Sequence, residues 1–380
     1  ELDQTAHGLP LGTYEFIMRA RGAAHSDTLT MAVTNEDITE DWEEVHDSSG
    51  ASAFLCMKKH LGKLYAGGDN GIIYVSEDGT TWSTEYDAVQ SEIHCLEVHE
   101  SQLYAGTGNN GKIFKRGSNG VWAEAYDLPN SETDVYALHS AFGYLYAGGN
   151  SSFIYRKASG SWAEYDELSV SFATTIWSMT SSAMNLILGT TGGGEARVIA
   201  SYQGGTGWTR WIFTTYGTAM TAIKMIDGEP YAGDNSGWVY RVSDAAEDSG
   251  QSSVNGVFSF WGLPHIATSN LGKLYTWTAT DTLELVNDFE TTDLYCGEVF
   301  GAHNYVGTGN TGKIYRSTDK VSAAQDIDCS DDHIYKWFAL PFEIKERDQG
   351  CTLKFMVTNN WVSGQSSAHV YVDVMAIVSK

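Results

Sequence analysis

The sequence predicts an all-β protein: a seven-bladed β-propeller inserted into a β-sandwich that the two chain termini form. Three observations predict this fold. A strand-rich unit recurs about every 40 residues, the last strand of such a unit occurs before the first complete unit, and apolar residues alternate in both terminal regions. Hydrophobic residues make up 42% of the 380 residues, which is enough to bury a sizeable core.

The composition argues against two classes of partner. Asp and Glu total 48 against 23 Lys and Arg, which gives a net charge of −25. Phosphate backbones and anionic lipid surfaces are repelled by such a surface, so nucleic acid is not an expected partner. No apolar run approaches the ~18 residues that a membrane span needs. No membrane span is therefore expected.

A short strand motif marks each repeat. It reads Leu-Tyr-Ala-Gly or a variant of it, at Leu64–Gly68, Leu103–Thr107, Leu145–Gly149, Leu186–Thr190, Pro230–Asp234, Leu274–Thr278 and Asn304–Thr308. The starts of these segments are 39, 42, 41, 44, 44 and 30 residues apart. A period near 40 residues indicates one supersecondary unit repeated along the chain.

Each unit is predicted to contain four short strands. An apolar strand such as Phe54–Lys58 precedes the motif strand, and a turn rich in Gly and Asn, such as Gly68–Gly71, follows it. A third strand passes through Ile73 and Tyr74, and a fourth begins at Trp82. Asn and Gly tolerate the positive φ that tight hairpins require. Four short strands without helical periodicity are typical of a propeller blade.

The N-terminal part of the chain indicates how the ring closes. Trp42–Asp47 matches Trp82–Asp87, whereas the last unit, Leu294–Asp319, contains only three strands. We therefore expect the strand near Trp42 to complete the last blade, which removes exposed strand edges. This predicts seven blades over residues 38–320. The interval of 30 residues after the sixth motif leaves little room for a fourth strand there, so a six-bladed ring is the alternative.

The terminal regions are predicted to form a second domain. Apolar residues alternate with polar ones in five segments, around Tyr14–Ala20, Leu29–Val33, Phe338–Ile344, Leu353–Val357 and Val370–Val378. A period of two indicates strands with one buried face. Ring closure brings residues 38 and 320 together, so residues 1–37 and 321–380 are expected to pair as one β-sandwich.

Two segments resemble known families. Ser76–Trp82 resembles the Asp-box turn of BNR-type propeller repeats, which occur in sialidases and in many surface and phage tail proteins, although it is one residue shorter. The resemblance implies a propeller. It does not extend to a sialidase arginine triad, because Arg156, Arg241 and Arg316 follow the repeat and so point in different directions. The last strand, around Val372–Val374, resembles jelly-roll carbohydrate-binding modules.

Three tryptophans depart from the repeat and are candidate binding residues. Trp277 stands where the other motif segments have glycine, so it is predicted to be a glycan-stacking platform or an interface anchor. The alternative is that it fills the gap left by a missing fourth strand. Trp211 and Trp261 are also off the pattern. The repeated tryptophans, in contrast, are expected to pack between blades.

The cysteines and one acidic run supply the remaining candidates. Cys56, Cys95 and Cys296 share one repeat position with Ala137, Ser178, Ala222 and Ile266, so they are interpreted as small buried residues. Cys329 and Cys351 are a candidate disulfide, which would imply an oxidising compartment. Asp326, Asp328 and Asp331 form a candidate structural calcium site, and the alternative is a solvated linker. No other cofactor is expected.

The functional expectation follows from these patterns. The sequence contains no nucleophile-elbow, zinc-protease or phosphate-loop motif, so we expect a protein that is not an enzyme. The expected role is a structural or adhesion protein of a cell surface, an extracellular filament or a virion. Its partners would be copies of itself or other assembly proteins, with the propeller displayed for interaction. The alternative is a carbohydrate-binding or carbohydrate-cleaving protein.

Overall fold

A computed structural model describes two kinds of region in this chain. It gives residues 42–317 except 49, 130–131, 159, 170–172, 203, 215, 242–244, 261–262, 279–281, 292 and 302, and it gives the backbone of the terminal strands within 2–35 and 321–379. The described residues are strands and their connections. None of them belongs to a helix long and apolar enough to cross a membrane.

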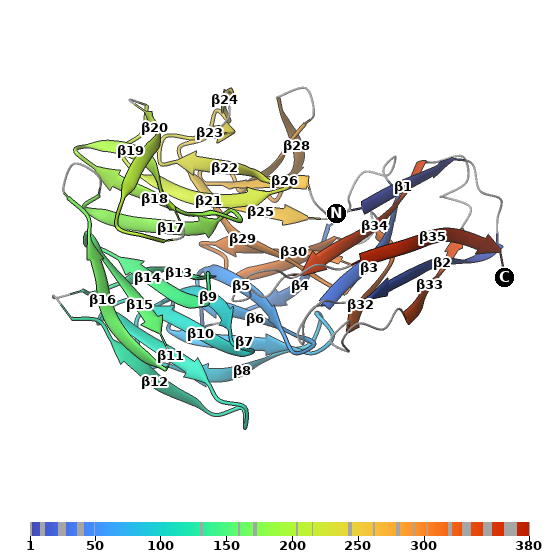
Figure 1. Cartoon of the computed structure of the whole chain (residues 1–380), viewed down its shortest axis with the longest axis horizontal. Coiled ribbons are helices and arrows are strands. Elements are labelled where there is room, and N and C mark those ends of the chain that lie inside the picture. The colour runs from blue at the N-terminus through green and yellow to red at the C-terminus, as the bar shows by residue number, and fades with distance from the viewer. Residues whose placement is uncertain are drawn as a thin grey trace. The chain divides into compact units, whose positions relative to one another are not determined.

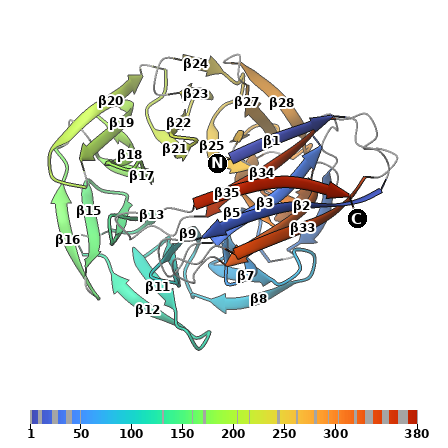
Figure 2. The same ribbon diagram turned by 45° about the vertical axis from the view of Figure 1, so that its right-hand side comes forward.

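Seven sheets of four strands each form the propeller (Figure 1). In the first six, the chain runs through the four strands in order, and each strand pairs with the next. Figure 2 shows the first six sheets arranged about a common centre, with the first strand of each of these blades innermost and the fourth strand outermost. The predicted all-β fold with seven blades is therefore confirmed.

The strands of the ring fall into four sets by their place in the blade. The first strands are β5 (Phe54–His60), β9 (Ile93–His99), β13 (Val135–Ala141), β17 (Thr175–Ser181), β21 (Met220–Ile226), β25 (Val254–Phe260) and β29 (Asp293–Phe300). The second strands are β6 (Lys63–Gly68), β10 (Gln102–Thr107), β14 (Tyr144–Gly149), β18 (Asn185–Gly192), β22 (Glu229–Asp234), β26 (Leu263–Thr268) and β30 (His303–Gly309). The third strands are β7 (Ile72–Ser76), β11 (Lys112–Arg116), β15 (Phe153–Ala158), β19 (Glu195–Tyr202), β23 (Trp238–Arg241), β27 (Lys273–Trp277) and β31 (Lys313–Ser317). The fourth strands are β8 (Trp82–Asp87), β12 (Trp122–Asp127), β16 (Ser161–Glu167), β20 (Trp208–Thr214), β24 (Ala245–Asp248), β28 (Leu283–Asp288) and β4 (Trp42–Asp47).

The seventh blade closes the ring as the sequence predicts. Its strand order is β29-β30-β31-β4, so a strand from the start of the ring is the outermost strand of the last blade. Two ion pairs join these segments: Lys313 Nζ lies 2.7 Å from Glu44 Oε2, and Arg316 pairs with Glu43. Backbone bonds from Ser48 N to Gly312 O (2.9 Å) and from Gly312 N to Ser52 O (2.8 Å) extend the closure.

The sixth blade differs from its prediction in the place of the motif strand. It has all four strands, β25 to β28, so no strand is missing. Its second strand is β26, and Gly256 pairs there with Ala267, as Cys56 pairs with Gly67 in the first blade. The segment around Trp277 is the third strand, β27. The small position of the first strands is therefore Gly256 in this blade, and the assignment of Ile266 to it was wrong.

The motif strand is buried on both faces because each blade packs between two others. Leu103, Tyr104 and Ala105 of β10 are at most 1% exposed. A side chain at Gly106 would meet Cys95 Sγ at 2.6 Å and the carbonyl oxygen of Val135, in the next blade, at 2.9 Å. The glycine is therefore required by the close approach of the neighbouring first strand.

The three described cysteines join neighbouring blades at this position. All are free thiols. The Sγ atoms of Cys56, Cys95 and Cys296 each donate to a backbone carbonyl of the next blade at 3.4 Å, those of Ile93, Val135 and Phe54. Burial raises the pKa of all three thiols. They are small buried residues, as predicted.

The outer strands pack through a repeated aromatic contact. The Trp122 ring stacks on Tyr86 of the preceding blade, with centroids 5.7 Å apart. Trp162 stacks in the same way on Tyr126, at 5.5 Å. In the seventh blade His46 takes the tyrosine position and lies 5.7 Å from Trp82. These repeated tryptophans therefore pack between blades.

The turn Ser76–Trp82 is held by local hydrogen bonds. Asp78 Oδ1 accepts the backbone N–H groups of Thr80 (2.8 Å) and Thr81 (2.6 Å), and Ser76 Oγ accepts that of Gly79 at 2.8 Å. The donors from Thr81 and Thr80 hold the pKa of the Asp78 carboxyl well below its usual range. Gly79 has a φ of 76°, a left-handed conformation that favours glycine.

The terminal strands form two further sheets. One has the order β1 (Leu2–His7), β34 (Thr352–Asn360), β3 (Thr28–Asn35) and β32 (Val321–Asp328), and the other has the order β33 (Lys336–Ile344), β2 (Gly12–Arg21) and β35 (Tyr371–Ser379). Strands from the two ends of the chain pair in both, as expected. β1 and β32 were not predicted. That the two sheets face each other as a sandwich stays a prediction.

The chain divides into two compact units. One comprises Glu1–Glu43, Val299–Asn304 and Arg316–Lys380, and the other comprises Glu44–Glu298 and Tyr305–Tyr315. The second unit contains the first six blades in full. All the residues of the candidate site described below belong to it.

Candidate functional site

An irregularity in the first strands of six blades creates the candidate site. The ladder between the first and second strands skips one residue near the start of β9, so His94 has no partner in β10. The same skip occurs at Leu55, Tyr136, Trp177, Thr221 and Asn255 in the other ladders that the structure gives. A β-bulge redirects the side chain of the extra residue. The ring therefore carries one set of redirected side chains at the start of its innermost strands.

Three of these side chains form a row of rings, which we call the aromatic row: His94, Tyr136 and Trp177. The His94 and Tyr136 centroids are 4.8 Å apart at a steep angle, and the Tyr136 and Trp177 rings stack at 4.6 Å. Trp177 Nε1 donates to Thr191 Oγ1 at 2.8 Å. All three rings are partly exposed. The row thus presents π surface from three consecutive blades.

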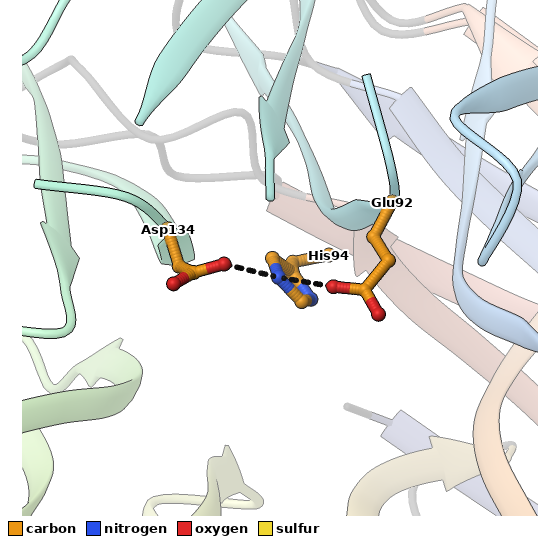
Figure 3. A group of neighbouring side chains, drawn as sticks. All are labelled: Glu92, His94 and Asp134. Carbon is orange, nitrogen blue, oxygen red and sulfur yellow. Dashed lines mark hydrogen bonds and ion pairs between the residues drawn. The ribbon is translucent and has the colours of Figure 1, made fainter. Parts of the chain in front are cut away.

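Carboxylates lie beside the aromatic row. Glu92 and Asp134 each stand two residues before a bulged residue, and both approach His94. His94 Nε2 is 3.1 Å from Glu92 Oε2 and 3.3 Å from Asp134 Oδ1 (Figure 3). Burial and then the charges of Asp134 and Glu92 raise the pKa of Tyr136 to about 12. The hydroxyl of Tyr136 is therefore neutral at physiological pH.

The acidic surface continues across the first and seventh blades. Tyr295 occupies in the seventh blade the repeat position of His94. Burial, followed by the charges of Asp293, Asp69 and Glu92, raises its pKa. Carboxylates from neighbouring blades therefore gather on one side of the ring.

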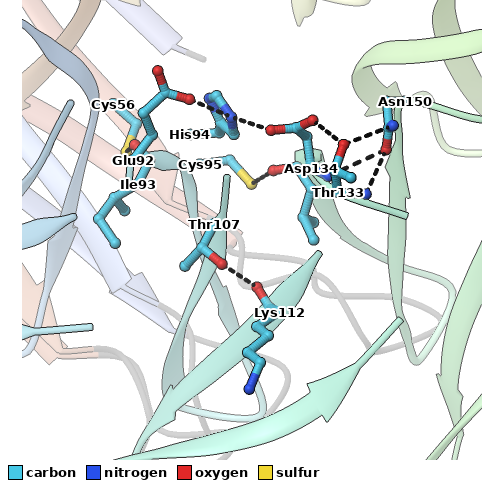
Figure 4. A network of polar contacts seen from close by, with 11 residues as sticks. Cys56, Glu92, Ile93, His94, Cys95, Thr107, Lys112, Thr133, Asp134 and Asn150 are labelled. Atoms are coloured by element: carbon cyan, nitrogen blue, oxygen red, sulfur yellow. Dashed lines mark hydrogen bonds and ion pairs between the residues drawn. The ribbon is translucent and has the colours of Figure 1, made fainter. Parts of the chain in front are cut away.

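Hydrogen bonds hold Asp134 in place. Thr133 Oγ1 donates to Asp134 Oδ2 at 2.6 Å. The side chain of Asn150 in turn holds Thr133: its Oδ1 accepts the Thr133 N–H at 3.0 Å and its Nδ2 donates to Thr133 Oγ1 at 2.8 Å (Figure 4). These contacts occupy Oδ2 and leave Oδ1 of Asp134 directed at the histidine.

A second group of ionisable side chains lies further along the first strands, and we call it the central charge ring: Lys58, Glu97, His139, Lys224 and Glu298. Lys58 Nζ lies 3.0 Å from Glu97 Oε1, and His139 Nδ1 lies 4.0 Å from Glu97 Oε2. His139 Nε2 and Ser181 Oγ are 2.9 Å apart. The residues belong to five blades but occupy one repeat position, and the charges of Lys58, Glu97 and Glu298 act on Lys224 from blades distant in sequence.

The pKa values in the central charge ring follow from burial and neighbouring charge. Burial lowers the pKa of His139 to about 4, against the opposing effect of Glu97. Burial would raise the pKa of Glu97, but Lys58, His139 and Lys224 outweigh it and the pKa falls. Protein atoms surround Lys224, although part of its side chain is exposed to solvent. Burial among these atoms and the charge of Lys58 lower its pKa.

The structure describes two of the three tryptophans that the sequence singled out, and it places them in different surroundings. Trp277 is 3% exposed and packs edge-on against Tyr231 at 5.9 Å, so it is a core residue and not a stacking platform. Trp211, on β20, is 37% exposed, and Trp261 lies outside the described residues. Trp211 is not part of the aromatic row.

The other candidates lie in the terminal region. Asp326 and Asp328 pair with Thr30 and Thr28 inside strand β32, so this part of the acidic run is a strand and not a linker. Asp331, Cys329 and Cys351 lie outside the described residues. The calcium site and the disulfide therefore stay predictions.

The repeat contained a signal for the aromatic row. The position just before Cys56, Cys95 and Cys296 holds Leu55, His94 and Tyr295, and it holds Tyr136 and Trp177 in the third and fourth blades. A column so rich in aromatic residues, next to a column of small ones, marks the bulge. The contact between Glu92 and Asp134, which are 42 residues apart in the chain, could not be found in this way.

The comparisons with known proteins identify the fold. No family model and no curated protein matches the chain. Virginiamycin B lyase from Staphylococcus aureus superposes with a TM-score of 0.62 at 13% identity, over 73% of this chain and 99% of that chain. The RRP9 WD40 repeats give 0.59 at 11%, over 76% and 99%. YCF48 from Cyanidioschyzon merolae gives 0.56 at 14%, over 73% and 98%. At these identities the likeness shows a propeller fold alone.

Proposed function

We propose that this chain is a non-enzymatic adhesion protein of an extracellular or virion surface, whose propeller binds a carbohydrate at the aromatic row. The observation that carries the proposal is the row itself, which combines partly exposed rings with carboxylates from two blades. Aromatic faces stack on the apolar faces of sugar rings, and carboxylates accept hydrogen bonds from sugar hydroxyls.

The charge of the protein narrows the ligand class. With a net charge of −25 and carboxylates beside the row, anionic sugars are repelled, so neutral glycans are the proposed ligands. The Asp-box-like turn of Ser76–Trp82 is in keeping with a relationship to glycan-active propellers. The terminal strands are proposed to connect the propeller to other copies or to other assembly proteins, because sheet edges suit contact between subunits.

A neutral-glycan array followed by calorimetry on the full chain tests the proposal. Trp177→Ala should weaken binding of any hit at least tenfold, a loss of about 1.4 kcal/mol. Trp211→Ala is the matched control, since it removes a partly exposed tryptophan outside the row. Equal loss in both variants would overturn the assignment of the site.

Two other outcomes would replace the proposal. Turnover of the bound glycan that one carboxylate substitution abolishes would make the protein an enzyme. If the protein binds no glycan and self-associates in light scattering, the assembly role would be supported and the carbohydrate-binding role would be contradicted.

A further inference from the structure

We propose that Glu92, His94 and Asp134 form a binding site for one divalent transition-metal ion of the zinc class. The inference does not rest on carbohydrate binding, because it concerns the ligand atoms alone. One imidazole nitrogen and one oxygen from each carboxylate all lie within 4.8 Å of one another. They come from the start of β9 and from the connection that precedes β13 (Figure 3).

Asp134 also takes part in a side-chain hydrogen bond with Tyr136, but a single nitrogen of His94 faces both carboxylates. Both carboxylate oxygens face the same nitrogen of His94, at 3.1 and 3.3 Å. A ring nitrogen carries at most one hydrogen, which points along one direction, so it cannot serve two oxygens with good geometry. A cation between the three atoms would interact favourably with all of them.

A missing side chain makes room for the three atoms to meet. The residue that follows the second strand is Asp69, Asn150 and Asn235 in the first, third and fifth blades. There its side chain accepts the backbone N–H of Ser52, Thr133 or Thr218 at 2.8 to 3.0 Å. In the second blade this residue is Gly108, so no capping side chain is present.

The space at Gly108 is occupied by the proposed ligands. A Cβ atom there would lie 2.8 Å from Glu92 Oε2 and 2.9 Å from His94 Nε2. Gly309 is the corresponding residue of the seventh blade, and there the ring of Tyr295 takes the space, 2.5 Å from such a Cβ. The second blade therefore differs from the seventh in filling this space with polar atoms.

The surroundings of the cluster suit a metal ligand set. Thr133 donates to the far oxygen of Asp134, and Asn150 in turn donates to Thr133, as outer contacts commonly hold ligating carboxylates. The Glu92 side chain is 39% exposed, so an ion can enter from solvent. The high negative charge of the protein raises the local concentration of cations.

The donor set selects the class of ion. Calcium and magnesium prefer oxygen ligands alone, whereas an imidazole with two carboxylates suits zinc and its neighbours in the first transition row. Three protein ligands leave at least one coordination position for water or another ligand.

Titration of the full chain with Zn²⁺, and with Co²⁺ followed by its visible absorption, tests the proposal after treatment with a chelator. We expect one saturable ion per chain and a rise in the melting temperature with Zn²⁺. His94→Ala and Asp134→Asn should each weaken the affinity about 100-fold, and Asn150→Ala about tenfold. Gly108→Asn should abolish binding although it changes none of the ligand residues, because its side chain would displace Glu92 and His94.

Glu124→Gln is the control variant. It removes one negative charge, as Asp134→Asn does, at an exposed carboxylate of the second blade that pairs with Lys112, and it should bind like the wild type. Circular dichroism of each variant without metal separates loss of the site from loss of the fold. Absence of a saturable ion in the wild type would overturn the proposal. Unchanged binding in folded His94→Ala would assign the ion to other carboxylates and overturn it as well.

Discussion

At the scale of single residues, Trp277 shows how a repeat can mislead. Ser76 on β7 pairs with Trp82 on β8, and in the sixth blade Trp277 on β27 pairs with Leu283 on β28. The tryptophan is on the fourth strand in the first blade and on the third strand in the sixth blade, and the smaller partner takes the other strand. The large ring therefore stays in the core. The sequence shows that Trp277 is unusual, but only the register shows that Leu283 compensates for it.

His139 is predicted to make the fold sensitive to acid. Its pKa is about 4 in the folded chain and about 6.5 in the unfolded chain. The unfolded chain therefore binds more protons between these values, and the contribution of His139 to stability is complete above pH 6.5 and lost as the pH falls to 4. The loss is on the order of 3 kcal/mol.

Chemical denaturation at pH 7.5 and pH 4.5 measures this effect. His139→Gln should lose less stability than the wild type across that interval. Other histidines with lowered pKa, such as His60 and His99, are unchanged by the substitution and cancel in the comparison. An equal loss in both proteins would show that His139 does not sense acid.

At the scale of elements, the strand order of most blades could be predicted because their motif strands share a strict requirement. Tyr and Ala are buried between blades, and the glycine must admit the neighbouring strand, so few sequences fit. The second strand of the sixth blade, Leu263–Thr268, meets this requirement differently. Its Ala267 is accommodated because the paired residue is Gly256. In this blade the glycine is on the first strand and the alanine is on the second strand. A search for Leu-Tyr-Ala-Gly therefore misses the second strand.

This exchange predicts a compensated pair of substitutions in the second blade. Gly106→Ala should cost about 1–3 kcal/mol of unfolding free energy, because its Cβ would lie 2.6 Å from Cys95 Sγ and 2.8 Å from a methyl group of Val135. Adding Cys95→Gly recreates the arrangement of the sixth blade and should recover part of the loss. Urea denaturation of the two single variants and the double variant measures the coupling. Purely additive losses would contradict the explanation.

The aromatic row and its carboxylates illustrate the limit of prediction at this scale. His94, Tyr136 and Trp177 stand in one column of the repeat, so their common place in three blades was available from the sequence. Their contacts were not, because a bulge shifts each of them out of the regular ladder. The approach of Glu92 to Asp134 also depends on the absence of a side chain at Gly108, which only a three-dimensional structure relates to them.

At the scale of the whole molecule, ring closure is the feature that the sequence predicted most directly. It required only that Trp42–Asp47 match Trp82–Asp87 and that the last unit lack such a strand. The packing of the terminal sheets is a different matter. Alternation identified five of their strands, but β1 and β32 carry weaker alternation and were missed.

Removal of the closing strand should expose the seventh blade. A chain that begins at residue 48 lacks β4 and its ion pairs from Glu43 and Glu44 to Arg316 and Lys313. Because β31 would then have an unpaired edge, we expect a lower melting temperature and concentration-dependent aggregation. A chain that begins at residue 42 retains β4 and is the control for loss of the N-terminal strands. Equal stability of the two chains would show that β4 is dispensable.

The shared last blade also determines where mechanical load enters the ring. The chain enters through β4 and leaves through β31, and these two strands are neighbours in one sheet. A pull on the two ends of the chain is carried first by the pairing of β3 with β32 and then by the bonds between β4 and β31, so the other six blades lie outside the path of the force. Once the pairing of β3 with β32 has opened, we expect the seventh blade to separate before the rest of the ring, so that the second and third blades, with Glu92, His94 and Asp134, keep their shape until it has failed.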